Sequence, residues 1–418
     1  MYKTCKDIEG SLYVAPNEIR ACCQRFFYKG EIRGDAQLIT IKDGQTPTNS
    51  DLLKARKKIF EQIQKNEKKA CNGCRYLYEV KEKPKFTSEV KHLSIEHHAV
   101  CNLRCTYCSD VYYDGKRSKY NVVEFISYLS KNNSFKNCNQ VVWGGGEPTL
   151  DKSFELILEE IEKEANPKLY HRVFTNSVRY SQAVDKFLKK GLIKIVTSVD
   201  AGTPEKFKEV RGRPRFYNVF ENLQKYASVD PSKITIKYIF TENNRQNDEL
   251  QNFVEKCLAY NLQNCNFQIS MNYKKEILEL EMLKSISFLF GKLFNNGIKK
   301  IFLDDHVMAR FVSLNDTEIL ELIKYLNENN IDNILIDSKK IDNLIIYGAG
   351  NIGEEIINKT NFFKLIKNYD VIDSDKKKIG SYINKKKIQP PEILKNDKRM
   401  IYISAAQAYD EVFKAIVS

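Results

Sequence analysis

The chain has 418 residues, of which 42% are hydrophobic and 29% charged, so it can bury the cores of the two or three domains that this length predicts. Its formal net charge is +13, but only 15 of the 67 basic residues are arginine, and the lysines are scattered along the chain. Because phosphate and base recognition favours clustered arginine, we do not expect a nucleic-acid partner.

The first residues, MYKTCKDIEG, contain no apolar segment, and no apolar run in the chain approaches the length of a membrane span. We therefore expect a cytoplasmic protein without a membrane span. In that compartment the eleven cysteines are more typical of metal ligands and buried core thiols than of disulfides.

Residues 1–88 are predicted to form an N-terminal cysteine-rich domain, with a lysine-rich helix near 51–69 and no regular repeat of strands. Cys71 and Cys74 have the spacing of metal ligands around an Asn-Gly turn. Together with Cys5 and either Cys22 or Cys23 they would supply four ligands to an iron–sulfur cluster or a zinc ion. Adjacent cysteines have difficulty binding the same ion, so only one of Cys22 and Cys23 is expected to do so. A region without metal is the remaining alternative.

Residues 89–305 alternate short apolar segments with amphipathic helices such as Asp248–Tyr260. This α/β pattern predicts a parallel sheet with right-handed crossovers, arranged as a barrel, a partial barrel or an open doubly wound sheet. The active site is then expected at the carboxyl ends of the strands. The predicted strands are His92–His97, Gln140–Trp143, His171–Thr175, Ile193–Val199, Ile234–Phe240, Asn266–Met271 and Lys300–Leu303.

The first of these strands runs directly into Cys101, Cys105 and Cys108, within the segment C-N-L-R-C-T-Y-C. Structural zinc sites normally have four protein ligands, and a 4Fe–4S cluster normally has four cysteine thiolates. Three thiolates in one loop would leave one iron with an open position, where a cofactor can bind. From spacing alone, a zinc loop or buried core thiols are the alternatives.

This loop, with Tyr107 before its last cysteine, resembles that of the radical S-adenosylmethionine (SAM) superfamily. The resemblance implies a partial (β/α)6 barrel, a 4Fe–4S cluster on the three cysteines, and SAM bound to the open iron. It also implies that an electron cleaves SAM to a 5′-deoxyadenosyl radical, which removes a hydrogen atom from the substrate. The electron would come from a donor such as flavodoxin or ferredoxin.

The resemblance extends over about 200 residues and implies further SAM-binding positions, although it identifies no catalytic side chain. In the family the segment that corresponds to Gly145-Gly146-Glu147 meets the amino group of SAM. Asn176, Ser198 and Asp200, near the ends of the next strands, would contact the ribose or carboxylate of SAM. The stretch VRGRPRFYNVFENL, within Glu209–Leu223, is also similar to a segment of this family.

Many radical SAM enzymes carry a second iron–sulfur cluster, and the N-terminal cysteines resemble such a site. The usual second-cluster domain follows the barrel, however, and no cysteine of this chain lies beyond Cys265.

Residues 306–340 are predicted to be a helical linker, and residues 341–418 a Rossmann-like module half the size of a complete dinucleotide fold. Gly348, Gly350 and Gly353 form G-x-G-x-x-G after an apolar strand, and Asp373 follows 20 residues later. Such glycines admit a pyrophosphate, and such an acid can bind a ribose. The module resembles one attached to bacterial enzymes of surface-glycan and nucleotide-sugar metabolism, so nucleotide binding and a purely scaffolding role are both open.

Taken together, these features predict a radical SAM enzyme that acts on a sugar, nucleotide-sugar or glycan-linked substrate. A radical SAM enzyme that modifies a peptide or protein is the first alternative. A non-catalytic scaffold that binds metal and a nucleotide is the second.

Overall fold

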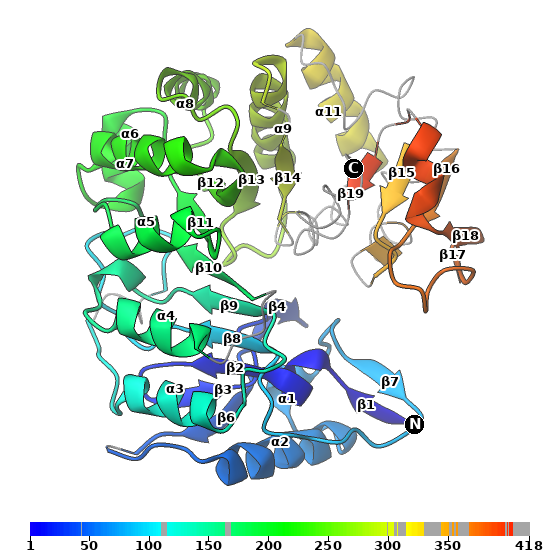
Figure 1. Cartoon of the computed structure of the whole chain (residues 1–418). Coiled ribbons are helices and arrows are strands. Elements are labelled where there is room, and N and C mark those ends of the chain that lie inside the picture. The colour runs from blue at the N-terminus through cyan, green and yellow to red at the C-terminus, as the bar shows by residue number, and fades with distance from the viewer. Residues whose placement is uncertain are drawn as a thin grey trace. The chain divides into compact units, whose positions relative to one another are not determined.

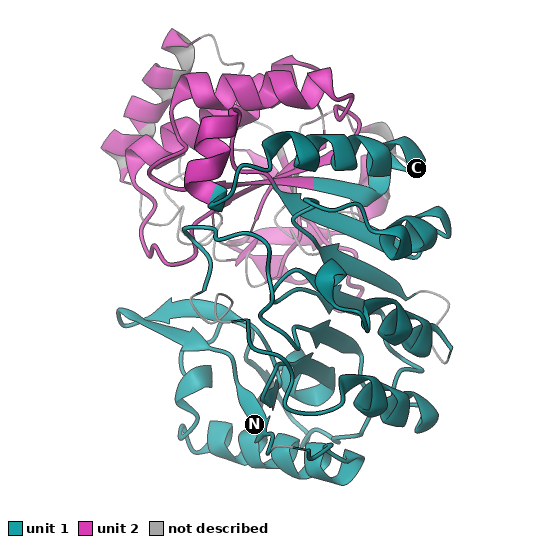
Figure 2. Cartoon of the chain, turned by 90° about the vertical axis from the view of Figure 1, so that its left-hand side faces the viewer, with its two compact units in different colours: residues 1–198, 211–235 teal, residues 199–210, 236–418 magenta. Residues whose placement is uncertain are grey.

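The computed structural model describes residues 1–42, 44–109, 115–163, 169–298, 300–304, 307, 315–329, 344–350, 353–354, 357, 368–397, 399 and 401–403. The chain divides into two compact units, which Figure 2 colours separately: residues 1–198 with 211–235, and residues 199–210 with 236–418. No helix in the described ranges is both long and apolar enough to cross a membrane.

The sheet of the first unit has the strand order β11-β10-β9-β8-β2-β3-β6 (Figure 1). The strands from β11 to β2 pair in parallel, whereas β3 and β6 add antiparallel strands at the edge. Alternate side chains such as Leu93, Val141 and Val173 are buried, as the period of two in a strand requires. The bounds are β2 Ser11–Val14, β3 Glu18–Arg20, β6 Gln37–Thr40, β8 His92–Ile95, β9 Gln140–Trp143, β10 Tyr170–Phe174 and β11 Ile193–Ser198.

The N-terminal region contributes strands to this same sheet, although its sequence shows no regular strand repeat. β2 pairs in parallel with β8, in register from Ser11 opposite His92 to Val14 opposite Ile95. These strands have only three or four residues each, too few to produce a periodic signal. The other elements here are β1 Tyr2–Thr4, α1 Lys6–Gly10, β4 Arg25–Tyr28, β5 Glu31–Gly34, α2 Asn49–Gln64, η1 Lys69–Cys71 and β7 Tyr78–Val80.

Helix α2 begins earlier and ends earlier than predicted. Thr48 and Asp51 form a capping box, in which each side chain accepts a hydrogen bond from the backbone of the other. Leu52, Ile59 and Ile63 form its buried face, and the lysine-rich continuation to residue 69 is not part of the helix.

Amphipathic helices follow the parallel strands and lie along the sheet of the first unit (Figure 1). In α3, for example, Phe125, Ile126 and Leu129 are fully buried. α3 packs against α4, and α5 packs against both α7 and β11. The bounds are α3 Val122–Lys131, η3 Pro148–Leu150, α4 Phe154–Glu162, α5 Gln182–Lys189, α7 Phe216–Val229 and η4 Pro231–Lys233.

The second unit continues the alternation of strands and helices. Its strands are β12 Ile234–Phe240, β13 Asn266–Met271 and β14 Ile301–Leu303, in the order β14-β13-β12, and β13 pairs in parallel with β14. Its helices are α6 Pro204–Arg211, α8 Asn247–Ala259, α9 Leu280–Asn295 and α11 Asp316–Glu328. Cys257 and Cys265 are fully buried, as expected for core thiols.

The C-terminal residues form a separate sheet with the order β17-β18-β16-β15-β19. β15 Leu344–Tyr347 pairs in parallel with both β16 Tyr369–Ile372 and β19 Ile401–Ile403, which is the arrangement of a half-Rossmann module. β17 Tyr382–Ile383, β18 Lys386–Gln389 and η6 Pro391–Asn396 complete it.

The large, mostly parallel sheet with its helices confirms the predicted α/β class and is consistent with a partial barrel. The predicted linker contains α11, but residues 330–340, the start of the terminal module at 341–343 and most of residues 351–367 lie outside the described residues. The domain boundaries at residues 88, 305 and 340 stay predictions.

Candidate functional site

The three cysteines of the loop after β8 lie close to one another. Cys105 is buried, and Cys101 and Cys108 are half-buried. The backbone N–H of Cys108 donates to the carbonyl of Cys105 at 3.1 Å, and the N–H of Leu103 donates to Cys101 Sγ at 3.5 Å. Burial and the neighbouring thiols of Cys105 and Cys101 raise the pKa of Cys108 to about 11. Thiols that are grouped in this way can bind a metal in their thiolate form.

The glycine-rich segment after β9 lies directly against the chain that leads into this loop. The N–H of Gly146 donates to the carbonyl of His98 at 3.0 Å, and the N–H of Glu147 donates to the carbonyl of Val100 at 2.8 Å. A Cβ on Gly146 would lie 2.1 Å from the Val100 carbonyl oxygen, and Gly145 has a φ of +86°. Only glycine permits this contact, which fixes the cysteine loop relative to the end of β9.

The Glu147 carboxylate is fully buried and engaged by protein donors. Oε1 accepts hydrogen bonds from the N–H and hydroxyl of Thr149, at 3.2 and 2.6 Å, and from the hydroxyl of Thr175 at 2.8 Å. Oε2 accepts from the N–H of Asn176 at 2.6 Å. Burial raises the pKa of this carboxyl, and these hydrogen bonds oppose the rise. Glu147 thus joins the ends of β9 and β10, and its role toward SAM stays a prediction.

Asn176 connects the end of β10 to the cysteine loop. Its side-chain amide donates to Asn102 Oδ1 at 2.6 Å and lies 3.8 Å from Cys101 Sγ. The other two predicted polar residues are placed differently. Ser198 is half-buried at the end of β11. Asp200 is buried in the second unit, where its carboxylate accepts from the N–H of Ile239 at 2.7 Å. The structure does not relate Asp200 to the cysteine loop.

A buried arginine holds the other side of the cysteine loop. The Arg211 carbonyl accepts from the N–H of Arg104 at 3.0 Å, and its guanidinium donates to the hydroxyl of Tyr107. Gly212 has a φ of +75°, and a Cβ there would lie 2.4 Å from the Arg104 carbonyl oxygen. The Arg211 charge acts to lower the pKa of Cys101 and Cys108, against the larger effect of burial.

Arg211 is a residue of this site that the sequence pattern did not predict. The stretch VRGRPRFYN was singled out, but without a role for any side chain. The available signal was an Arg-Gly pair at the end of an amphipathic helix, where a glycine often adopts a positive φ, as Gly212 does.

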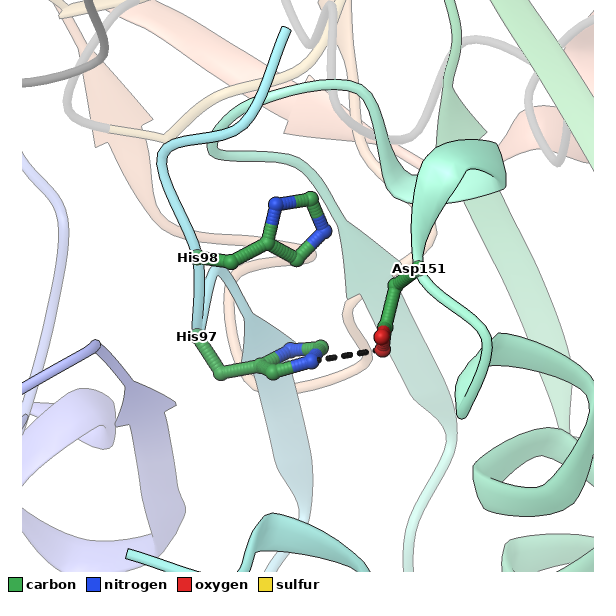
Figure 3. Close-up of side chains that lie close together, drawn as sticks. All are labelled: His97, His98 and Asp151. Carbon is green, nitrogen blue, oxygen red and sulfur yellow. Dashed lines mark hydrogen bonds and ion pairs between the residues drawn. The ribbon is translucent and has the colours of Figure 1, made fainter. Parts of the chain in front are cut away.

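His97 and His98, between β8 and the cysteine loop, lie close to Asp151, which directly follows η3 (Figure 3). Their ligand atoms are all within 4.8 Å of one another. His97 Nε2 is hydrogen-bonded to Asp151 Oδ2 at 2.8 Å, and His98 Nδ1 accepts from the N–H of Val100 at 3.2 Å. Both rings are buried, as is usual for histidines that are packed and hydrogen-bonded in a core.

A pocket opens beside the carboxyl ends of β2 and β8. Its lining includes Tyr13, Arg20, Arg25, Glu96, Ser109 and Lys116. The Tyr13 hydroxyl donates to Glu96, and Asp35 pairs with both arginines, at 3.2 and 3.0 Å. Ser109 directly follows Cys108, so the pocket adjoins the cysteine loop. Cations and a carboxylate together offer both donors and acceptors to a ligand.

The N-terminal cysteines lie elsewhere in the same unit. Cys5 and Cys71 are buried in one apolar cluster, against which Cys22 packs. Cys74 is half-buried one turn after Cys71, and Cys23 is exposed.

In the terminal module the glycine-rich turn and the acid meet. Asp373 accepts hydrogen bonds from the N–H of Ala349 at 2.7 Å and of Asp375 at 2.8 Å, and pairs with Lys378 at 3.1 Å. Gly348 has a φ of +113°, Gly350 is half-buried and Gly353 is buried at the start of the following helix. Nucleotide binding here stays a prediction.

Comparison with known families matches residues 95–254 to the Radical SAM superfamily. Among curated proteins, the GTP 3′,8-cyclase of Mannheimia succiniciproducens is 27% identical over 174 residues, which is 41% of this chain and 51% of that protein. The GTP 3′,8-cyclase of Yersinia pestis is 31% identical over 152 residues, 35% of this chain and 46% of that protein. The chain thus spans about half the length of the curated relatives that it matches.

The solved structures that the chain matches include Streptococcus suis SuiB bound to S-adenosylmethionine, with a TM-score of 0.44 and 16% identity over 65% of this chain and 60% of that one. Native anSMEcpe with bound AdoMet has a TM-score of 0.41 and 20% identity over 53% of this chain and 65% of that one.

Proposed function

Since residues 95–254 are a radical SAM domain, we propose that Cys101, Cys105 and Cys108 hold a 4Fe–4S cluster in this chain. Enzymes with this catalytic domain use such a cluster together with SAM. The observation that carries the proposal is the gathering of three thiols in one loop, fixed on one side by Gly146 and on the other by Arg211.

The residues present fit a cluster with one open iron. Cys101 receives a backbone N–H and the Asn176 amide, the kind of donors that stabilise metal-bound sulfur. The buried Arg211 supplies a positive charge beside an assembly that carries net negative charge. In the described part of the chain, no other thiol is grouped with these three: Cys138 donates to the Gln140 carbonyl at the start of β9, and Cys257 and Cys265 neighbour each other.

When bound, the cluster and SAM would supply an electron and a sulfonium whose cleavage yields a 5′-deoxyadenosyl radical. The protein's part is to position the groups and to limit water. Gly145 and Gly146 let the backbone after β9 approach the segment that leads into the cysteine loop closely. The hydrogen bond between the Asn176 N–H and the Glu147 carboxylate joins the ends of β9 and β10.

For the substrate, we propose a sugar-containing molecule, such as a sugar, a nucleotide-sugar or a glycan-linked compound. Two features support this class. The pocket beside Ser109 presents Arg20, Lys116 and Glu96, and hydroxyl groups of a sugar can both donate to and accept from such a lining. In addition, the curated relatives are GTP 3′,8-cyclases, whose substrate is a nucleotide.

SAM cleavage is the direct test of the radical chemistry. Anaerobically reconstituted protein with SAM and either dithionite or a flavodoxin is expected to form 5′-deoxyadenosine, measured by mass spectrometry. Replacement of Cys101, Cys105 and Cys108 by Ala is expected to abolish it. Cys138→Ala, a buried cysteine outside the loop, is the matched control and should retain it. Product formation by the triple variant would refute the assignment and leave the metal-and-nucleotide scaffold as the better hypothesis.

Deuterium transfer tests the substrate class. A nucleotide-sugar deuterated on its sugar carbons is expected to give deuterated 5′-deoxyadenosine, with less transfer in Glu96→Gln. Transfer from a deuterated peptide instead would favour the alternative of a peptide- or protein-modifying enzyme.

A further inference from the structure

Three stretches that are distant in sequence bring four N-terminal cysteines together. Cys5 begins α1, Cys22 precedes the β4–β5 hairpin, and Cys71 and Cys74 flank the turn after α2. Cys5 and Cys71 are each 8% exposed in one apolar cluster, and Cys22 packs against the same cluster. The N–H of Cys74 donates to the Cys71 carbonyl at 3.1 Å, which keeps the fourth thiol next to the third.

The turn between Cys71 and Cys74 is shaped by its packing against the hairpin. Gly73 has a φ of +76°, and a Cβ there would lie 2.0 Å from the ring of Tyr28 in β4. β5 also contacts η1, which ends at Cys71. The hairpin that follows Cys22 therefore holds the Cys71–Cys74 turn in place, and the grouping is built into the fold of this region.

Backbone N–H groups point at the sulfurs: those of Ile8 and Asp7 at Cys5, and those of Tyr76 and Leu77 at Cys74. Donors of this kind stabilise thiolates that are bound to metal.

The structure distinguishes Cys22 from Cys23, which the sequence leaves open. Cys22 is half-buried against the cluster that contains Cys5 and Cys71, whereas Cys23 is exposed.

The spacing of the sulfurs separates zinc from an iron–sulfur cluster. Four thiolates on one tetrahedral zinc lie about 3.8 Å apart, because each Zn–S bond is about 2.3 Å. Within the described residues, no three of these thiols have sulfurs all within 4.8 Å of one another, and the same is true of Cys101, Cys105 and Cys108. A cluster of four irons holds its thiolates further apart than one ion does.

We propose that Cys5, Cys22, Cys71 and Cys74 bind a second 4Fe–4S cluster, in which every iron has a protein thiolate. The site is independent of the SAM-binding loop. Because no iron is left open, this cluster does not bind SAM, and its spectrum does not respond to SAM.

Iron counting on matched variants tests the site. Reconstituted protein is expected to hold about eight irons and eight sulfides per chain, since each cluster contributes four. The variant in which Cys101, Cys105 and Cys108 are Ala should keep about four irons, with the electron paramagnetic resonance signal of a reduced 4Fe–4S cluster that SAM does not alter. Cys71→Ala/Cys74→Ala should keep the other four, with a signal that SAM does alter.

Single variants then identify the second ligand. Cys22→Ser is expected to lose about four irons and Cys23→Ser none, although the two substitutions are chemically identical. Circular dichroism of each variant checks that it is folded.

Three outcomes would overturn the proposal. One is that the 101/105/108 triple variant holds no iron. Another is that it holds one zinc ion per chain by elemental analysis. The last is equal iron loss in Cys22→Ser and Cys23→Ser. In any of these cases, 5′-deoxyadenosine formation by the wild-type protein would still support the proposed function, so the two failures are distinguishable.

Discussion

At the scale of single residues, backbone proximity explains why glycine occupies the positions next to the cysteine loop. A Cβ on Gly146 would meet the backbone carbonyl of Val100 at 2.1 Å, whereas one on Gly144 would meet the flexible end of Glu96 at 3.0 Å. The Val100 carbonyl cannot move without the surrounding backbone, whereas the Glu96 side chain can rotate away.

Gly146→Ala is therefore expected to lower the melting temperature by several degrees, in line with a cost of about 1–3 kcal/mol for overpacking. It should also reduce the iron bound at the cysteine loop. Gly144→Ala is the control and should change both little. Calorimetry of the apoprotein and iron analysis after reconstitution measure the two effects. Equal behaviour of the two variants would contradict this account of the loop.

The buried Glu147 carboxylate accepts hydrogen bonds at both oxygens. In Glu147→Gln one position becomes an NH₂ group that faces a donor, either Asn176 N–H or the Thr149 and Thr175 groups. We expect a loss of about 2–3 kcal/mol in the free energy of unfolding, the usual cost of an unsatisfied buried donor next to a lost charged hydrogen bond. Urea denaturation measures it. Glu155→Gln, whose side chain is 45% exposed, is the control.

His171 provides a pH-dependent contribution to stability. Its Nδ1 accepts from Trp143 Nε1–H at 3.0 Å, so the proton is on Nε2, which donates to Glu162 at 2.7 Å. Burial lowers the pKa of His171, with Glu162 opposing. Below about pH 6.5 the imidazole of His171 is protonated in the unfolded chain but stays neutral in the folded chain. The free energy of unfolding therefore falls as the pH is lowered.

In His171→Asn this contribution is absent. The free energy of unfolding of the wild-type protein should decline more steeply between pH 7 and 5 than that of the variant, by at most about 1.4 kcal/mol per pH unit. Urea titrations at a series of pH values give both slopes. Parallel curves would show that the pKa of His171 is the same in the folded and unfolded chains.

At the scale of elements, one arginine ties α2 to the strands of the N-terminal region. Arg56 is 1% exposed, and its guanidinium donates to the carbonyls of Glu9, Thr87, Glu89 and Ser11 at 3.0–3.2 Å. Ser11 begins β2, so this one side chain holds α2 against a strand of the sheet. Burial lowers the pKa of Arg56 to about 10, which still leaves it charged at neutral pH.

Arg56→Met fills similar volume but leaves these carbonyls without a donor. We expect a loss of about 3 kcal/mol or more, because each buried unsatisfied group costs about 1–3 kcal/mol. Lys58→Met, on the exposed face of the same helix, should change stability by about 0.5 kcal/mol or less. If the two variants unfold at the same urea concentration, Arg56 does not have this role.

The bounds of the strands also show where the pattern in the sequence was sufficient to predict a strand. β9, β12 and β13 have the predicted bounds, because apolar residues alternate with other residues along most of β12 and β13, and β9 is a short apolar run. β2, β3 and β6 were not predicted. Strands of three or four residues take their stability from pairing with a neighbour, and this information is not local.

At the scale of the whole molecule, cluster binding should stabilise together segments that are far apart in the sequence. The cysteine loop contacts the glycine-rich segment after β9 and the Arg211–Gly212 segment before α7. A ligand that binds only the folded arrangement stabilises all of it.

Anaerobic reconstitution is therefore expected to raise the melting temperature above that of the apoprotein, by about 4–8 °C for each additional 2 kcal/mol of stabilisation of a unit of about 200 residues. The variant with Ala at Cys101, Cys105 and Cys108 should show a smaller rise, and removal of iron by a chelator should reverse it. Calorimetry under argon measures the three states. A rise of the same size in the triple variant would mean that the loop does not bind the cluster.

The sequence by itself determined the α/β class, the three-cysteine loop and the glycine-rich turns. These are local patterns, in which the residues that matter lie within one strand-to-helix connection. Only the tertiary structure placed Arg211 against Tyr107, engaged the Glu147 carboxylate with β10 and separated Cys22 from Cys23. Those results depend on which distant backbones come within hydrogen-bonding distance and which side chains are excluded from water, and no short window of sequence contains either.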